Sequence, residues 1–462
     1  MKKPNIVFIL IDDLGWRDLG CYGSSFYETP NIDKLATQGM SFTNAYATCP
    51  VCSPTRASIL TGKYPARIGL TNYIGGKSKG KLIDAPYIEY LPLSEKSIAK
   101  VLKEHGYDTW HVGKWHLGGE KYYPAKHGFD ISVGGCHWGI AFNGYFNPWN
   151  IPTIDDNDAP KGTYLTDYLT DKAIELINSK NDKPFFLNLW YYSVHIPIQA
   201  KQDKIDYFRE KKERLGLDKI DPFELGDHFP TERKKKLVIK RRIIQSSANY
   251  AAMVHSVDEN VGRILEVIED SGESENTIVF FTSDNGGLST AEGSPTCNFP
   301  LSEGKGWMYE GGVRDPLIVK WPGQIKGNSI CEVPMTFTDF YPTFLELAGI
   351  EILPKQHPDG VSILPLLKGE NVMYDRPIYW HYPHYGNQGG TPGSSIRKGD
   401  YKLIEFFEDN HVELYNLRDD IEEKNEISTK FPEITEELRL SLQNWRKSLD
   451  AKIPQKNPKY KE

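Results

Sequence analysis

The chain has 462 residues and a mass of 52.6 kDa, which suits one large domain with a smaller companion. Hydrophobic residues make up 39%, charged residues 25%, and the mean hydropathy is −0.50, so a disordered or fibrous chain is excluded. No apolar stretch is long enough to span a membrane, and a net charge of −7 argues against a dedicated nucleic-acid binder.

Apolar runs of strand length alternate with helical patterns over the larger, N-terminal part of the chain. This alternation is typical of a mostly parallel sheet covered by helices, an α/β fold. Apolar residues recur on one helical face in 250–268 and in 93–105, so both segments are predicted helices. The predicted strands are Asn5–Ile11, Tyr107–Val112, Pro184–Trp190 and Thr277–Thr282.

The last part of the chain has a different pattern. Short apolar segments separated by turns, at 378–380, 395–407 and 412–417, predict an antiparallel sheet, and an amphipathic helix follows at 434–449. We therefore predict a large domain over residues 1–370, which carries the chemistry, and a smaller α+β domain over 371–462.

The N-terminus begins with two lysines and an apolar run, as secretory signals do. The run Ile6–Ile11 is short and ends in Asp12-Asp13, so we interpret it as the first buried strand. The chain as given leaves the compartment open, and a periplasmic or secreted location with a leader removed is our expectation. The six cysteines are too few and too scattered for a disulfide scaffold.

Polar residues follow the predicted strands directly. In open parallel sheets the loops beyond the carboxyl ends of strands converge on one crevice, so such residues are the first site candidates. Asp12 and Asp13 follow one strand, and Asp284 and Asn285 follow another. Their hard oxygens would suit one Ca²⁺, with Mg²⁺ as the alternative, although residues of these types also begin ordinary turns.

The strongest local motif is Cys52–Arg56 (CSPTR). Ser53 and Pro54 are predicted to be the N-cap and first residue of a helix, which places Cys52 just outside a helix N-terminus with Arg56 one turn further on. Amide groups, the helix dipole and a guanidinium would together stabilise an anion there. A buried structural cysteine and a C-x-x-C redox pair formed with Cys49 are the alternatives.

These residues resemble the formylglycine-dependent sulfatase family, also called type I sulfatases. The family signature Cys-x-Pro-Ser-Arg is present with Thr55 in place of serine, and Thr61-Gly62 stands where the family has Thr-Gly. The resemblance extends over nearly the whole chain. The remaining family motifs occur in family order at Asp12-Asp13, 113–118 (GKWHLG), 194–197 (VHIP), 283–286 (SDNG) and Gly304-Lys305.

The resemblance implies an alkaline-phosphatase-like fold and a set of roles. A maturation enzyme would convert Cys52 to formylglycine, whose hydrate attacks sulfur, and a divalent cation would lower the pKa of that hydrate. The implied cation ligands are Asp12, Asp13, Asp284, Asn285 and residue 52. The implied catalytic residues are Arg56 to hold the hydrate, Lys114 and Lys305 to bind sulfate, His195 as general acid and His116 as the base that regenerates the aldehyde.

The sugar would be chosen by loops and by the smaller domain. His381 and His384 lie in a run of aromatic and hydrogen-bonding residues that continues to Asn387 and Gln388, which suits a sugar ring or an ordinary edge strand. An aromatic-rich loop at 138–149 and the basic run 233–236 are further candidates, with packing and a solvated face as their alternatives. We predict an exo-acting enzyme for a sulfated sugar, with galactose or N-acetylgalactosamine favoured.

Two other functions compete with this prediction. Phosphatases and phosphodiesterases of the same superfamily use two zinc ions and need a histidine beside the later metal aspartate, where this chain has Asn285. A catalytically dead glycan-binding relative would have gaps in the catalytic set, whereas every expected position is filled.

Overall fold

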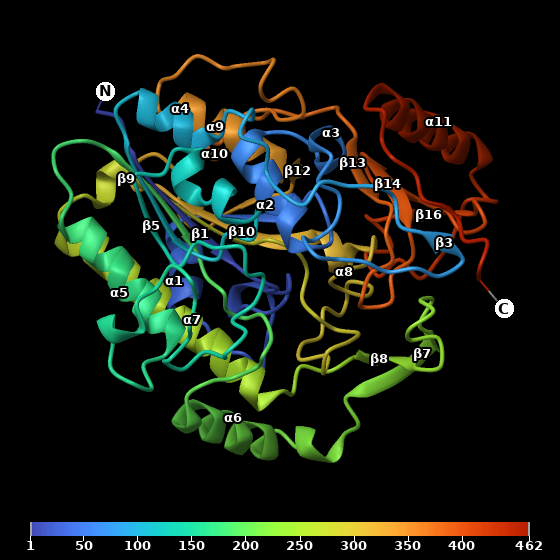
Figure 1. Ribbon diagram of the computed structural model, residues 1–462, viewed down its shortest axis with the longest axis horizontal. Coiled ribbons are helices and arrows are strands. Elements are labelled where there is room, and N and C mark those ends of the chain that lie inside the picture. The colour runs from blue at the N-terminus through green and yellow to red at the C-terminus, as the bar shows by residue number, and fades with distance from the viewer. Residues whose placement is uncertain (1, 461–462) are drawn as a thin grey trace.

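The computed structural model describes residues 2–460 and is built around a nine-stranded, mostly parallel sheet (Figure 1). The strand order is β11-β2-β10-β9-β1-β6-β4-β5, with β12 paired to β2, and β10 runs antiparallel to both of its neighbours. The strands are β1 (Asn5–Ile11), β2 (Met40–Tyr46), β4 (Asp108–Gly113), β5 (Ile131–Val133), β6 (Phe185–Trp190), β9 (Thr277–Ser283), β10 (Arg314–Lys320), β11 (Ser329–Cys331) and β12 (Met335–Thr336).

Helices cover both faces of this sheet, as Figure 1 shows. Strand β1 is buried on both sides: Val7, Ile9 and Ile11 pack into one core and Ile6, Phe8 and Leu10 into the other. One face is covered by α1 (Pro30–Gln38), α5 (Leu165–Asn178) and α7 (Ala248–Asp270), and the other by α2 (Cys52–Thr61), α4 (Ile98–Glu104), α9 (Phe340–Leu347) and α10 (Leu364–Leu367). The predicted parallel sheet sandwiched by helices is confirmed.

Side-chain caps fix where two of these helices begin. Ser247 accepts a hydrogen bond from the backbone amide of Tyr250 at the start of α7, and Ser97 accepts one from Lys100 at the start of α4. Helix α4 therefore starts five residues later than the predicted segment 93–105, because Ser97 offers a cap and the residues before it form turns.

The C-terminal part forms the predicted antiparallel sheet and helix, at the right of Figure 1. Its sheet contains β13 (Ile378–Tyr382), β14 (Gly393–Lys398), β15 (Tyr401–Phe406) and β16 (Val412–Asn416) in sequence order. Helix α11 (Pro432–Ser448) buries Leu438 and Leu442 against this sheet. On the other side, Lys402 of β15 is fully buried between Glu310, which starts α8 (Glu310–Val313), and Glu423.

The sequence patterns predicted no helix or strand in the charged segment between β6 and α7. It forms α6 (Gln202–Arg214) and a hairpin of β7 (Phe223–His228) and β8 (Val238–Arg242). The remaining elements are α3 (Pro65–Ile68), β3 (Leu82–Ile83), β17 (Gln455–Lys456), and the 3₁₀ turns η1 (Gly20–Tyr22), η2 (Glu120–Tyr122), η3 (Pro124–His127), η4 (Asp156–Asp158), η5 (Leu217–Lys219), η6 (Ser274–Asn276) and η7 (Phe337–Asp339).

The structure of residues 2–460 bears on two features that we did not expect from the sequence, a disulfide scaffold and a membrane-spanning helix. All six cysteines are free thiols, in keeping with the absence of a disulfide scaffold. Within this described part of the chain, none of the helices has the length and apolar character that crossing a bilayer requires.

Candidate active site

Two neighbouring parallel strands bring the predicted metal ligands together. Strands β1 and β9 are paired with Ile11 opposite Ser283, so the residues that follow each strand emerge side by side. The backbone amide of Asp13 donates to Asp284 Oδ1 at 3.2 Å, and Asn285 Nδ2 donates to Asp13 Oδ1 at 2.8 Å. Four of the five predicted ligands, three carboxylates and one amide, therefore form one contiguous buried group.

Three buried cations balance this group. Lys114 Nζ lies 2.5 Å from Asp12 Oδ2, Lys305 Nζ 2.7 Å from Asp13 Oδ2, and Arg56 Nε 2.8 Å from Asp284 Oδ2. Arg56 and Lys114 have no exposed side-chain surface, and Lys305 is 6% exposed. Since an unpaired charge at such depth costs several kcal/mol, the cations and carboxylates hold each other in place.

The oxygen atoms of this group that accept no hydrogen bond suit a hard cation. Asp12 Oδ1 and Asn285 Oδ1 are buried without a hydrogen-bond partner in the described part of the chain. Burial raises the pKa of Asp12 to about 8, whereas burial at Asp13 is outweighed by Lys305, His195 and Lys114 together, which lower the pKa of that carboxyl. Oxygens of Asp12 and Asp13 also lie within 4.8 Å of a ring nitrogen of His195. Carboxylate and amide oxygens are the ligands that Ca²⁺ and Mg²⁺ prefer.

Cys52 is the first residue of α2, so the prediction that Ser53 caps this helix is wrong. Val51 occupies the cap position without a side-chain bond. Ser53 Oγ instead accepts from the amide of Ile74 at 3.3 Å and lies 3.2 Å from His116 Nδ1. The serine hydroxyl is thus used to position His116 beside Cys52, whose Sγ lies 3.3 Å from the same nitrogen.

The thiols do not have the character of a redox pair. Burial raises the pKa of both Cys49 and Cys52, whereas the attacking cysteine of a C-x-x-C motif needs a lowered pKa. The Sγ of Cys49 lies 4.0 Å from the carbonyl oxygen of Thr71. The C-x-x-C alternative is therefore disfavoured.

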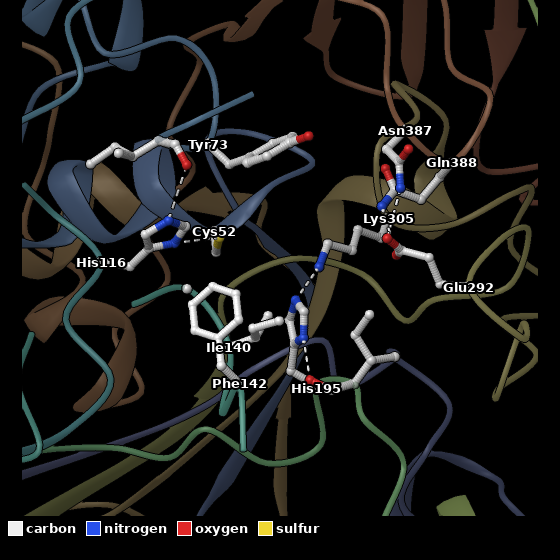
Figure 2. Close-up of a pocket in the computed structure, with 13 residues that line it drawn as sticks. Cys52, Tyr73, His116, Ile140, Phe142, His195, Glu292, Lys305, Asn387 and Gln388 are labelled. Carbon is white, nitrogen blue, oxygen red and sulfur yellow. Dashed lines mark hydrogen bonds between the residues drawn. The ribbon is translucent and has the colours of Figure 1, made fainter. Parts of the chain in front are cut away.

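His195 lies on the opposite side of the site from His116 (Figure 2). Its Nε2 is 2.8 Å from Lys305 Nζ and 3.5 Å from Asp13 Oδ2, and its Nδ1 is 3.0 Å from the carbonyl of Ile196. Burial and the neighbouring Lys305 lower the pKa of His195 to about 3, and burial with Lys114 and Arg56 lowers that of His116. Both shifts favour the neutral imidazole in the free pocket.

These groups open into a cavity of about 220 Å³, shown in Figure 2. Cys52, His116, His195 and Lys305 line it directly, while Arg56 and Lys114 are fully buried. The other lining residues are Tyr73, Ile74, Gly139, Ile140, Phe142, Ile196, Glu292, Asn387 and Gln388. A single small pocket therefore brings the predicted nucleophile, both histidines and one lysine to the same space.

The prediction that His381 and His384 bind substrate is corrected by their positions. Neither lines the cavity, and both are buried in hydrogen bonds. His381 contacts Ser394 Oγ at 2.7 Å and the carbonyl of Lys452 at 2.9 Å, and His384 contacts Thr71 Oγ1 at 2.9 Å. The residues of this region that do reach the cavity are Asn387 and Gln388, in the loop after β13.

Glu292 was missed by the sequence reasoning. It lies in the loop between β9 and α8 at φ +53°, and its carboxylate accepts from Asn387 Nδ2 at 2.7 Å and from Gln388 Nε2 at 3.2 Å. No local motif marks it, because only the tertiary meeting of two loops gives it a role. Of the predicted aromatic loop, Phe142 lines the cavity, whereas Tyr145 and Trp149 pack in the core.

Comparison with known proteins identifies the family. The model of the sulfatase family matches residues 4–350, and the model "N-sulphoglucosamine sulphohydrolase, C-terminal" matches residues 303–448. A sulfatase of Formosa agariphila is 35% identical over 96% of this chain and 88% of its own. The chain belongs to the sulfatase family and is a sulfuric ester hydrolase.

Relatives and solved structures with named substrates are also similar. Mouse N-acetylgalactosamine-6-sulfatase is 33% identical over 87% of this chain and 72% of its own, and N-acetylglucosamine-6-O-sulfatase of Bacteroides thetaiotaomicron is 29% identical over 93% and 83%. The structure of Ps i-CgsB in complex with k-i-k-neocarrahexaose superposes with a TM-score of 0.76 at 30% identity, covering 96% of this chain and 93% of that one.

Proposed function

We propose that this sulfatase removes sulfate from a terminal sugar residue, of galactose or N-acetylgalactosamine type, using a formylglycine made from Cys52 and one divalent cation. The observation that carries the proposal is the meeting of Cys52, His116, His195 and Lys305 in one cavity above the buried carboxylates. The relatives named for N-acetylgalactosamine and N-acetylglucosamine 6-sulfates support a carbohydrate substrate.

The size of the cavity supports action on a single terminal ring. At about 220 Å³ it is smaller than the ~300–1,000 Å³ of pockets for drug-sized ligands. A space of this size can hold about one hexose with its sulfate group. Tyr73 and Phe142 offer flat apolar surfaces to the ring, as Figure 2 shows.

Glu292 is proposed to recognise hydroxyl groups of that ring. A carboxylate accepts hydrogen bonds only, and its two oxygens here are held by the amides of Asn387 and Gln388. Because Glu292 lines the cavity, its remaining lone pairs can accept hydrogen bonds from sugar hydroxyls. The carboxylate also disfavours a second anionic group on the same part of the ring.

The reaction needs a nucleophile, charge stabilisation and a proton donor. Formylglycine would supply a hydrated aldehyde oxygen, and a cation held by Asp12, Asp13, Asp284 and Asn285 would lower the pKa of that group and screen the sulfate charge. Because Cys52 is only 3% exposed, its oxidation must precede completion of the fold.

The residues of the chain divide the remaining work. Lys114 and Lys305 place fixed positive charge where sulfate oxygens gain negative charge as the S–O bond breaks. Arg56 is oriented by Asp284 and by the carbonyl of Lys114, 3.1 Å from its Nη1. His116, beside Cys52 Sγ, is placed to accept a proton from the group at position 52.

His195 is placed to protonate the leaving alkoxide. In the free pocket Lys305 lowers its pKa, but a bound sulfate would engage Lys305 and bring negative charge close to the ring. Both changes favour the protonated imidazole, so substrate binding itself prepares the acid.

A panel of defined sugar sulfates tests the substrate assignment. We expect faster sulfate release from terminal galactose and N-acetylgalactosamine sulfates than from the matching glucose and N-acetylglucosamine sulfates, measured as kcat/KM. Because a site that hydrogen-bonds a hydroxyl group discriminates strongly against its absence or displacement, the preference should exceed about tenfold. Equal rates on both series would contradict the assignment of the galacto configuration.

Cation binding can be measured without turnover. Calcium in excess is expected to raise the melting temperature by roughly 3–5 °C, because a ligand at about 100 times its Kd stabilises by about 2.7 kcal/mol. An Asp12→Asn variant should lose most of this shift. Asp258→Asn is the matched control, since that buried carboxylate binds the amides of Asn31 and Ile32. If calcium raised the melting temperatures of both variants equally, the cation would bind at another site.

A further inference from the structure

A second, larger groove continues from the catalytic cavity. It has a volume of about 810 Å³ and shares Tyr73 and Asn387 with the cavity lining, so the two spaces adjoin. Figure 2 shows both residues at the upper rim of the catalytic cavity. A substrate whose terminal ring fills the cavity would therefore extend past Tyr73 and Asn387 into the groove.

The groove carries an excess of positive charge. Four of its lining side chains are cations and two are carboxylates. Glu232 pairs with Lys79 at 3.2 Å, and Asp84 accepts from the amide of Ser78 at 2.6 Å. Within residues 2–460, Lys77 and Arg233 form no ion pair and no hydrogen bond with protein.

Lys234 adds a third cation without a carboxylate partner. Its Nζ donates to the backbone carbonyl of Asn387 at 2.8 Å and to Asn387 Oδ1 at 2.7 Å, both neutral acceptors. No carboxylate forms an ion pair with this ammonium within residues 2–460, although Glu292 acts on it electrostatically, and the contact fixes Asn387 at the junction between groove and cavity.

The wall that holds Arg233 is anchored at three points. The backbone amide of Glu232 donates to the carbonyl of Lys79 at 2.9 Å, Asn457 Nδ2 donates to Glu232 Oε1 at 3.0 Å, and Thr231 is buried. The basic run 233–236 is thus divided: Arg233 and Lys234 line the groove, whereas Lys236 is exposed outside it.

We propose that this groove is an anion-binding subsite that holds a sulfated or carboxylated sugar residue next to the ring whose sulfate is hydrolysed. The inference rests on the proposed function, because it places the scissile ring in the catalytic cavity. Lys77 and Arg233 would contact the anionic group, and Tyr73 would pack against the sugar between the two sites. The preferred substrate would then be an oligosaccharide with charge on consecutive residues.

Three disaccharides with the same sulfated terminal ring test the proposal. The neighbouring ring is neutral in the first, sulfated in the second and a uronic acid in the third, and kcat/KM is measured for each. We expect the wild type to prefer at least one charged neighbour over the neutral one by about tenfold, since one or two exposed charge contacts act on this scale. Comparing kcat/KM for the second and third substrates shows whether the groove prefers a sulfate or a carboxylate group.

Matched variants locate the effect in the groove. Lys77→Gln and Arg233→Gln should each lower the preference ratio about threefold, and the double variant should bring it close to one. Lys236→Gln removes the same charge from the same loop outside the groove, so its ratio should equal that of the wild type. Added salt should weaken the preference of the wild type and leave that of the double variant unchanged.

The outcomes separate the two proposals. A wild type that desulfates all three disaccharides equally, or groove variants that keep the wild-type ratio, would overturn the subsite and leave the proposed function standing. An equal loss in Lys236→Gln would also overturn it, by showing a general effect of charge. Release of sulfate from none of the sugar sulfates would instead refute the proposed function.

Discussion

Replacement of Cys52 by alanine is expected to abolish sulfate release, with a loss of at least about 10⁴-fold in kcat. The reason is that the proposed aldehyde hydrate can be made only from the cysteine at position 52, and removing a covalent nucleophile costs orders of magnitude even when binding is intact. The measurement is sulfate release by purified Cys52→Ala protein compared with wild type at equal, saturating substrate.

Cys49→Ala is the matched control for this experiment. Cys49 lies three residues earlier, is buried, and does not line the cavity, so its replacement should leave turnover within about twofold of wild type. Mass spectrometry of the peptide containing residue 52 from active wild-type enzyme should show loss of the thiol sulfur. Full activity in Cys52→Ala, or an unmodified thiol in active enzyme, would rule out the proposed nucleophile.

Replacement of Lys402 by methionine is expected to have the largest effect on stability. Lys402 lies 2.9 Å from Glu310 and 3.0 Å from Glu423, and all three side chains are fully buried. Removing the cation leaves the buried Glu423 without its ion-pair partner beside Glu310, which keeps only its pair with Arg314, and breaking a buried pair costs roughly 3–5 kcal/mol in the free energy of unfolding. Denaturant unfolding followed by fluorescence measures the loss.

Lys398→Met provides the comparison on the same sheet. Lys398 is 43% exposed and pairs with Glu437, which is 61% exposed, so its replacement should change stability far less than that of Lys402. Without Lys402 the buried carboxyl groups should have raised pKa values in the folded state. The Lys402→Met protein should therefore lose stability as the pH rises from 5 to 8. Equal stabilities of Lys402→Met and Lys398→Met would show that the buried ion pairs of Lys402 do not stabilise the fold.

The strands around the site were predictable because each has an apolar run and an abrupt polar end. Strand β1 was predicted with its observed bounds, β6 and β9 differ from prediction by one residue at one end, and β4 differs by one residue at each end. The order of these strands in the sheet could not be predicted, since it depends on pairing between residues far apart in sequence. Antiparallel β10, inserted between β2 and β9, is of this kind.

Local sequence patterns gave wrong or missing predictions where the role of a side chain depends on contacts with residues far away in the sequence. Ser53 has the chemistry of a helix cap, but its hydroxyl contacts His116 and the amide of Ile74. His381 and His384 looked available for a sugar, yet strand alternation does not reveal which face of β13 another part of the chain covers. Glu292 became visible only when two loops were brought together.

The loop after β13 has a consequence for how the enzyme could change during evolution. Asn387 and Gln388 reach the cavity from a segment whose sequence is independent of the strand ends that carry Asp12, Asp284 and Lys114. Mutations in this segment can select a new sugar without disturbing the atoms that cleave the ester. New specificities can therefore arise from substitutions in this loop, while the strand ends that carry the reactive groups are inherited unchanged.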